Sequence, residues 1–371
     1  MVDNAKPDPK SIKARLLRLA DADMVFWLMP PLIILLIVGT VAQRWMGLYE
    51  ATNTFFSSFV IWAGPLPLPG GFTLLGILAA NLTLKFLFKS EWSLTKSGII
   101  LSHLGALILL LGGLLTAIYA EEKYMIIPEG GETPFIYDYT KRSLMIFEDE
   151  KPIARMPFSA IDQWHANDFP FDIKITQHCE NCEILKREET EDYDPAANYQ
   201  SMAQFMALKP KAPEKEPEAN LTGFEFDLTG TQTDGHYLAF DGMPKPIEFT
   251  ANNKKYAFIF GKEQETLPFS IKLKDFVKET YPGTQKAKSY HSDVIINDGD
   301  IEWETRIEMN EPLRYKGYTF FQSSFDQSDI GETTILSVVK NEGWLFPYIG
   351  TAVLGLGLLL HVIIIYRRKR T

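Results

Sequence analysis

The sequence has only two cysteines among its 371 residues, and both lie in one short H-C-E-N-C segment that begins at His178. Glu183 follows Cys182, so the histidine that completes a C-x-x-C-H motif for covalent haem attachment is missing. A four-ligand zinc site needs two further ligands, and only His178 is nearby. The pair Cys179 and Cys182 therefore predicts a local structural disulfide first, an exchangeable redox disulfide second and a metal site third.

Motifs of the common enzyme classes are also missing. The sequence contains no G-x-x-x-x-G-K-[ST], no G-x-S-x-G and no H-E-x-x-H. Its 37 Lys and Arg against 47 Asp and Glu give a formal net charge of −10, which does not indicate nucleic-acid binding. We interpret His165, His236 and His291 as surface or strand-edge residues. A hydrolase, a nucleotide-driven transporter and a nucleic-acid-binding protein are all disfavoured.

Four long apolar runs are present instead. They are Val25–Val41, Phe72–Phe88, Gly98–Tyr119 and Leu345–Ile365. A helix rises about 1.5 Å per residue, so each run has the length needed to cross the hydrocarbon core of a membrane. Pro30 and Pro31 should kink the first run, and no small-residue cleavage site follows it. We therefore expect a retained helix rather than a signal peptide.

The block between the third and fourth runs differs in composition. Residues 120–343 are polar and acidic, and short β-branched or alternating stretches recur between Gly, Pro, Asn and Asp. This pattern predicts a sandwich or open barrel of about ten strands. Residues 186–220 are rich in charge and proline, and predict an exposed and flexible loop. The predicted fold is an α+β membrane protein with four transmembrane helices, three before and one after a large β-rich domain.

The flanking charges predict the orientation. Basic residues lie before the first run, between the second and third, and after the fourth: Lys10, Lys13, Arg15, Arg18, Lys85, Lys89, Lys96, Arg367, Arg368, Lys369 and Arg370. By the positive-inside rule these flanks face the cytoplasm, so both termini are cytoplasmic and the β-rich domain is extracytoplasmic. The expected divisions are a basic arm at 1–24, three helices within 25–119 with an interfacial aromatic loop at 44–71, the β-rich domain at 120–343, a fourth helix at 344–366 and a basic tail at 367–371.

Two of the six histidines, His103 and His361, lie inside apolar runs. A polar ring in lipid is costly, so each indicates a functional site or a hydrogen bond to a neighbouring helix. Counted from the cytoplasmic ends, they lie about 8 and 9 Å deep. Helical periodicity aligns His103 with Gly113, and His361 with Gly350 and Gly357, which indicates helix packing or room for a flat ligand. Two neutral imidazoles at similar depth could hold a haem between them.

Four short motifs follow one another along the chain. The first run ends in G-T-V-A-Q at Gly39–Gln43, where Ala42 replaces the proline of a G-T-x-x-P-Q signature. The third run has H-L-G from His103 and G-G from Gly112, and P-E-G-G-E follows from Pro128. Residues 310–324 read NEPLRYKGYTFFQSS. In this order the motifs resemble the ResB/CcsB family of cytochrome c biogenesis proteins.

The resemblance implies a haem-handling subunit for c-type cytochromes in the bacterial inner membrane. In that family, a CcsA-type partner with a tryptophan-rich W-W-D segment joins this subunit in passing haem outward for attachment to C-x-x-C-H apocytochromes, alongside a thiol-reducing thioredoxin-like protein. Only His103 matches the family's intramembrane haem ligand, and non-covalent haem b is the implied cofactor. His361 has no such match and is a separate candidate for a second ligand. The chain lacks a W-W-D segment, which implies an accessory rather than a catalytic subunit.

The residues leave two other functions open. One is an electron-transfer cytochrome in which His103 and His361 both bind haem within a single chain. The other is an assembly scaffold whose β-rich domain binds only proteins.

Overall fold

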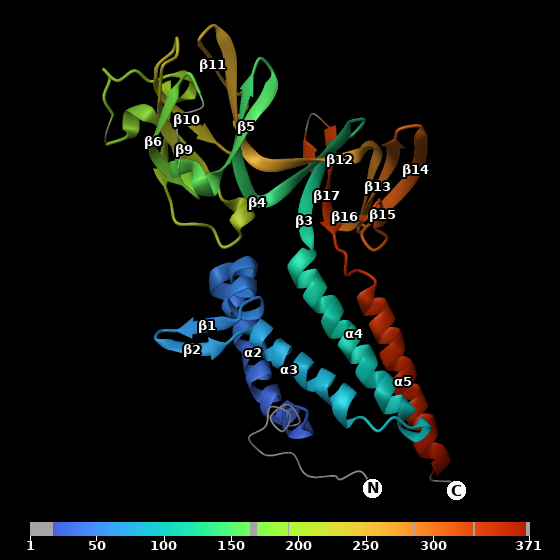
Figure 1. Ribbon diagram of the computed structural model, residues 1–371. Helices are drawn as coiled ribbons and strands as arrows, with labels where there is room; N and C mark the ends of the chain where they lie inside the picture. Colours follow the sequence, from blue (N-terminus) through green and yellow to red (C-terminus); the bar gives the residue numbers. More distant parts are fainter. Residues whose placement is uncertain (1–17, 164–168, 192, 285, 329–330, 369–371) are drawn as a thin grey trace. The chain divides into compact units, whose positions relative to one another are not determined.

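The computed structural model describes residues 18–163, 169–191, 193–284, 286–328 and 331–368. The chain divides into two compact units (Figure 1). A helical unit comprises the chain up to Glu121 together with the part from Lys340 onward, and a β unit comprises Glu122–Val339. The expected arm at 1–17, His165 and the last residues of the tail, 369–371, lie outside the described residues.

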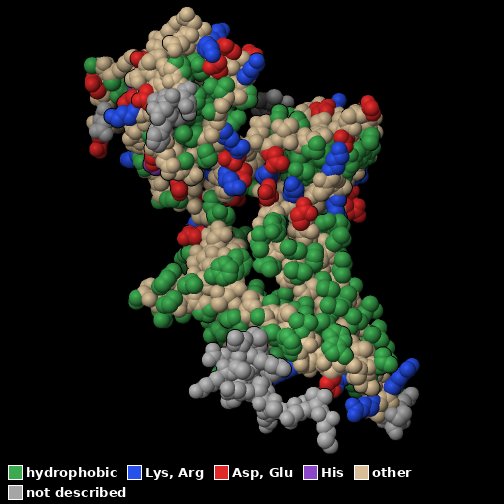
Figure 2. Space-filling view, viewed as in Figure 1, with side chains coloured by type: hydrophobic (Ala, Val, Ile, Leu, Met, Phe, Trp, Pro, Cys, Tyr) green, Lys and Arg blue, Asp and Glu red, His purple; other side chains and the backbone are tan. Residues whose placement is uncertain are grey.

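The helical unit contains the four expected apolar helices, α2 (Ala22–Ala51), α3 (Gly71–Leu84), α4 (Ser97–Tyr119) and α5 (Phe346–Arg368). With their flanking turns, four segments are long and apolar enough to cross a membrane. Hydrophobic side chains cover much of the visible face of these helices (Figure 2). Pro30 and Pro31, which are expected from the sequence to kink this helix, do not end it. Both prolines lie inside α2, and the kink is at Gly47, where the backbone has a φ of 82°.

The segment after the kink is more regular than the loop expected at 44–71. Helix α2 continues to Ala51 and is followed by a π-helical turn, Thr52–Phe56. A two-stranded hairpin comes next, formed by β1 (Val60–Ala63) and β2 (Leu66–Pro69). The hairpin projects from α2 and α3 (Figure 1).

The β unit has two lobes, and two long strands, β4 (Glu132–Glu148) and β12 (Lys254–Thr280), take part in both of them. Its strands are β3 (Glu121–Pro128), β4 (Glu132–Glu148), β5 (Lys151–Pro157), β6 (Asp172–Cys179), β7 (Cys182–Lys186), β8 (Met206–Pro210), β9 (Gly223–Thr229), β10 (Gly235–Phe240), β11 (Ile247–Ala251), β12 (Lys254–Thr280), β13 (Ala287–Asp298), β14 (Ile301–Glu308), β15 (Leu313–Tyr315), β16 (Tyr318–Ser328) and β17 (Gly331–Lys340). The largest sheet has ten strands in the order β14-β13-β12-β4-β3-β17-β16-β15, with β11 paired to β12 and β5 to β4. The remaining strands form a three-stranded sheet, β10-β9-β6, and the pair β7-β8.

The two lobes have separate hydrophobic cores. In the first lobe, one end of β4 and β12 packs against the β10-β9-β6 sheet, and Phe224, Phe226 and Phe258 are buried between them. In the second lobe, the other end of β4 and β12 packs with β3, β13, β14, β16 and β17 around Met125 and Ile271. Strand β14 also packs against β15 and β16, so this sheet curls toward a barrel. The sandwich and the open barrel of the sequence prediction therefore each describe one lobe.

The expectation that 186–220 forms an exposed loop is also corrected by the structure. Strand β8 lies within it and pairs along its length with β7. The short helical turn Ser201–Gln204 buries Ala203 completely, and Arg187 is 6% exposed. The burial of Ala203 and Arg187 fixes this segment to the β unit, although the rest of it is rich in charge and proline.

Candidate functional site

Helices α4 and α5 pack antiparallel through a stripe of glycines that recurs every seven residues. A Cβ atom at Gly98 would lie 2.4 Å from the backbone nitrogen of His361, and one at Gly105 would lie 2.5 Å from that of Leu354. Glycines of α5 make the same kind of contact with α4, since a Cβ at Gly357 would lie 2.4 Å from the backbone nitrogen of Ser102. The backbones therefore touch, and the packing explanation for the glycines of α5 is confirmed.

His103 lies on a different face of α4 from this stripe. At 100° per residue, it is rotated about 140° from Gly98, which faces α5. Gly113, which by the same count lies about 80° from His103 around the helix, has open space where a Cβ would be. Lys85, just after α3, is a charge that acts on His103. His103 thus projects from a side of α4 that α5 does not cover.

The imidazole of His103 is incompletely satisfied. Its Nδ1 is buried and has no hydrogen-bond partner, and the same is true of Nδ1 of His361. Within the described parts of the chain, only two other buried side-chain atoms share this state, Asn81 Oδ1 and Asn297 Oδ1. An unpaired buried polar group destabilises the folded state by about 1–3 kcal/mol. A hydrogen-bond donor or acceptor, or a metal ion, that bound the free nitrogen of each ring would remove this penalty.

The two histidines are not brought onto a common face. The backbone of His361 meets α4 at Gly98, and His103 is five residues further along, or about 8 Å by helical rise. Of the two explanations for the small residues near His103, packing on α5 does not apply to Gly113, which has open space where a Cβ would be. Each histidine therefore presents a separate candidate ligand position, with an orphaned nitrogen at both.

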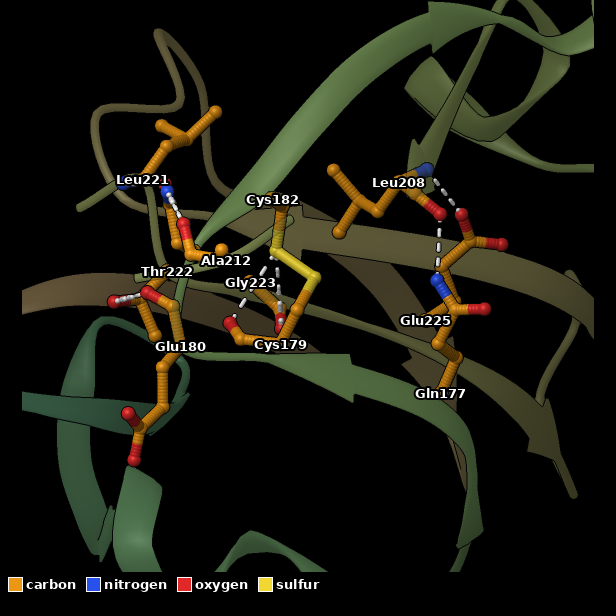
Figure 3. The surroundings of a disulfide bond; sticks show 11 residues. Gln177, Cys179, Glu180, Cys182, Leu208, Ala212, Leu221, Thr222, Gly223 and Glu225 are labelled. Carbon is orange, nitrogen blue, oxygen red and sulfur yellow. Dashed lines mark hydrogen bonds between the residues drawn. A yellow bond between two sulfur atoms is a disulfide. The ribbon is translucent and has the colours of Figure 1, made fainter. Parts of the chain in front are cut away.

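The predicted disulfide between Cys179 and Cys182 is present, and it is buried (Figure 3). The two residues are 6% and 4% exposed and pack with Ala203, Leu208 and Leu238. Hydrogen bonds enclose the turn, including Thr222 Oγ1 to the Glu180 carbonyl at 2.8 Å and Cys182 N to the Leu221 carbonyl at 2.7 Å. Thiol exchange requires access to a sulfur atom, so this burial favours a structural role.

The β unit contains a charged cluster that sequence reasoning missed. His236 on β10 directs Nδ1 at Asp227 Oδ1, 2.8 Å away, and Nε2 at Glu225 Oε2, 2.7 Å away. Arg187 donates to the same Glu225 oxygen at 3.0 Å, and its guanidinium lies 4.7 Å from the centre of the Tyr199 ring. These side chains line a pocket of about 630 Å³. Only the antiparallel pairing of β9 with β10 places His236 opposite Asp227.

The cluster shifts the pKa values of its members in opposite directions. Burial disfavours the charged form of His236, but hydrogen bonds to Glu225 and Asp227 outweigh it and raise its pKa. Burial likewise disfavours ionised Glu225, yet His236, the Leu208 N–H and Arg187 lower the pKa of this carboxyl. The geometry therefore stabilises an imidazolium between two carboxylates.

Comparison with known proteins gives a family match, which lies in the β unit and the turn before α5. Residues 248–344 match the ResB-like family. The resemblance to the ResB/CcsB family is confirmed. The matched residues run from β11 to the turn before α5 and include the 310–324 segment, in which Gln322 is buried and bonded to Ser292 and Thr334. They do not include His103 or the disulfide.

Two relatives are similar in sequence to part of this chain. The protein NrfI of Wolinella succinogenes is 39% identical over 106 residues, which are 28% of this chain and 12% of that protein. The cytochrome c biogenesis protein CcsB of Picosynechococcus sp. is 33% identical over 94 residues, which are 24% of this chain and 20% of that protein. The aligned segments thus span a fifth or less of either relative.

Proposed function

We propose that this chain is a haem-handling subunit in the maturation of c-type cytochromes. It works with a CcsA-type membrane partner and passes haem from the cytoplasmic to the extracytoplasmic side, where haem is attached to C-x-x-C-H apocytochromes. The ResB-like match and a relative named as a cytochrome c biogenesis protein support this class of function. The orphaned Nδ1 of His103, inside a helix apolar enough to cross a membrane, is the observation that carries the proposal.

The donor chemistry at His103 fits haem iron. A neutral imidazole is a common axial ligand of haem through Nε2, and the buried Nδ1 of this ring has no hydrogen-bond partner within the helices. Open space at Gly113, further along α4, leaves room there for a flat ring or for a partner helix. Haem is the cargo, and this chain contributes its binding and orientation.

The β unit has a different role in this proposal. It lies in the chain between α4 and α5, and by the positive-inside rule it is extracytoplasmic in the inner membrane. It then docks the partner or the apocytochrome, and the buried disulfide maintains the fold of its first lobe. In this proposal the subunit is accessory, and the partner with the W-W-D segment, which this sequence lacks, carries out the attachment.

A maturation assay tests this function. The chain is expressed with a CcsA-type partner and a C-x-x-C-H reporter cytochrome, and covalent haem in the reporter is measured by peroxidase staining. We expect His103→Ala to reduce the holocytochrome yield at least tenfold at equal membrane abundance of the subunit. His291→Ala, in the β unit, is the matched control. Equal yields from His103→Ala and the unaltered chain would refute the proposal.

The orphaned nitrogen of His361 supports a second candidate, a cytochrome with two histidine ligands in one chain. That function requires haem retention without any partner protein, and loss of the haem spectrum in His361→Ala alone. The separate faces of the two histidines favour the first proposal over this one.

A further inference from the structure

The β1–β2 hairpin exposes apolar side chains along most of its length. Trp62 is 69% exposed, Leu66 58% and Leu68 41%, whereas Ile61 packs toward α2 and α3. The hairpin forms a projecting hydrophobic patch in the space-filling view (Figure 2). A lone two-stranded hairpin is marginal in water, so its surroundings must help to hold it.

The hairpin is fixed firmly to the helices. A Cβ at Gly70 would lie 2.3 Å from the Ser58 carbonyl oxygen, and one at Gly71 would lie 2.2 Å from that of Phe56. Gly70 N donates to the Phe59 carbonyl at 3.0 Å, and Thr73 Oγ1 donates to the same oxygen at 2.6 Å. These contacts tie the base of the hairpin to the start of α3, so it has a defined position beside the helices.

Prolines remove the hydrogen-bond donors from one edge of the hairpin. Alternate residues of an antiparallel strand face the partner strand, and the bond from Gly70 N to Phe59 sets which ones do. The backbone N–H groups of Leu66 and Leu68 then point toward β1. The backbone nitrogens of Pro67 and Pro69 point away from it. Proline has no N–H, so the outer edge of β2 presents carbonyls only.

The outer edge of β1 and the composition of the segment also restrict the environment in which the hairpin is stable. On β1, Val60 and Trp62 keep outward N–H groups, which need water or headgroup oxygens. The sequence has no Asp, Glu, Lys, Arg or His from Ala51 to Leu84. An uncharged and apolar hairpin with one donor-free edge is unsuited to bulk water, and its open edges are unsuited to the centre of a bilayer.

We propose that the β1–β2 hairpin is a membrane-plane anchor that lies in the lipid headgroup and upper acyl region. Its occupant is lipid: acyl chains contact Leu66 and Leu68, and headgroup oxygens and water satisfy the outward N–H groups of β1. Trp62 provides the amphipathic ring that favours this depth. A fixed anchor beside α2 and α3 sets the depth of the helical unit. This role does not depend on haem binding.

Spin-label depth measurements test the anchor. The only two cysteines form a disulfide, so Leu66→Cys and Val60→Cys each introduce a unique free thiol for a nitroxide. The labelled full chain is reconstituted in phosphatidylcholine and phosphatidylglycerol vesicles, and collision with oxygen is compared with collision with a water-soluble nickel chelate. The controls are Leu111→Cys on α4 for the membrane interior and Ile301→Cys on β14 for water; these residues are 48% and 59% exposed.

We expect the oxygen-to-nickel collision ratio at both hairpin positions to exceed that at position 301 several-fold and to remain below that at position 111. A ratio equal to that at position 301 would overturn the proposal, because the hairpin would then lie in water. The measurement is repeated in polymer-extracted native nanodiscs. A strongly immobilised label that neither reagent reaches there would also overturn it, in favour of a protein partner.

Discussion

The imidazole of His236 faces a carboxylate oxygen with each of its ring nitrogens, from Asp227 and Glu225. A neutral ring can donate from only one nitrogen, so the second contact requires protonation. The folded state raises the pKa of His236 above 6.5 despite its burial. Protonation therefore stabilises the fold. This contribution is complete below the unfolded-state pKa and is lost as the pH rises through the folded-state pKa.

We predict that the thermal stability of the β unit falls between pH 6 and pH 8 in the unaltered chain and falls less in His236→Gln. Glutamine keeps one donor but does not titrate. The measurement is the melting temperature of the purified chain in detergent, followed by near-ultraviolet circular dichroism across this range. Parallel pH profiles for the two chains would show that His236 does not carry the effect.

The disulfide at Cys179 and Cys182 makes a second prediction at this scale. Closing so short a loop contributes about 2 kcal/mol in the chain-entropy model. We expect Cys179→Ala with Cys182→Ala to lower the free energy of unfolding by about that amount, and to leave the holocytochrome yield per folded molecule unchanged. A yield that falls while stability is preserved would instead assign the pair a redox role.

At the scale of elements, the α4–α5 pair depends on backbone contact at Gly98 and Gly105, and on contact with the Phe346 side chain at Gly112. Gly105 faces the backbone of Leu354, and Gly113 faces open space although it is only eight residues along the same helix. A side chain at Gly105 must therefore push the helices apart, whereas one at Gly113 need not. The two positions form a matched pair.

We predict that Gly105→Leu costs about 1–3 kcal/mol, the usual cost of overpacking, and that Gly113→Leu is close to neutral for stability. The melting temperature of the detergent-solubilised chain measures both. If Gly113→Leu also reduces haem retention while the protein stays folded, the face of α4 at Gly113 is occupied by ligand or partner. Equal destabilisation by the two changes would contradict the packing described here.

The elements that sequence could predict are those with local causes. Apolar runs gave the four helices, and the spacing of Cys179 and Cys182 gave the disulfide. The β8 strand inside 186–220 is missed because the charge and proline of that segment mask its pairing with β7. The His236 cluster is missed because it needs the β9–β10 register and also Arg187, which lies 38 residues before Glu225. The separate faces of His103 and His361 follow from the α4–α5 register, which contacts more than two hundred residues apart in sequence determine.

At the scale of the whole molecule, the family match and the candidate ligand lie in different parts of the chain. The ResB-like match covers 248–344, in the β unit and the turn before α5, and His103 is on α4. The match supports the class of protein, and the orphaned imidazole supports the role in haem binding. The two observations are independent, so haem binding requires its own measurement.

That measurement is the optical spectrum of the purified full-length chain with its membrane partner, oxidised and reduced. The account predicts a haem Soret band in the unaltered complex, its loss in His103→Gly, and its recovery when imidazole is added to that variant. His361→Ala, the matched intramembrane change, should keep most of the band. An undiminished spectrum in His103→Gly would contradict the central claim that His103 binds haem.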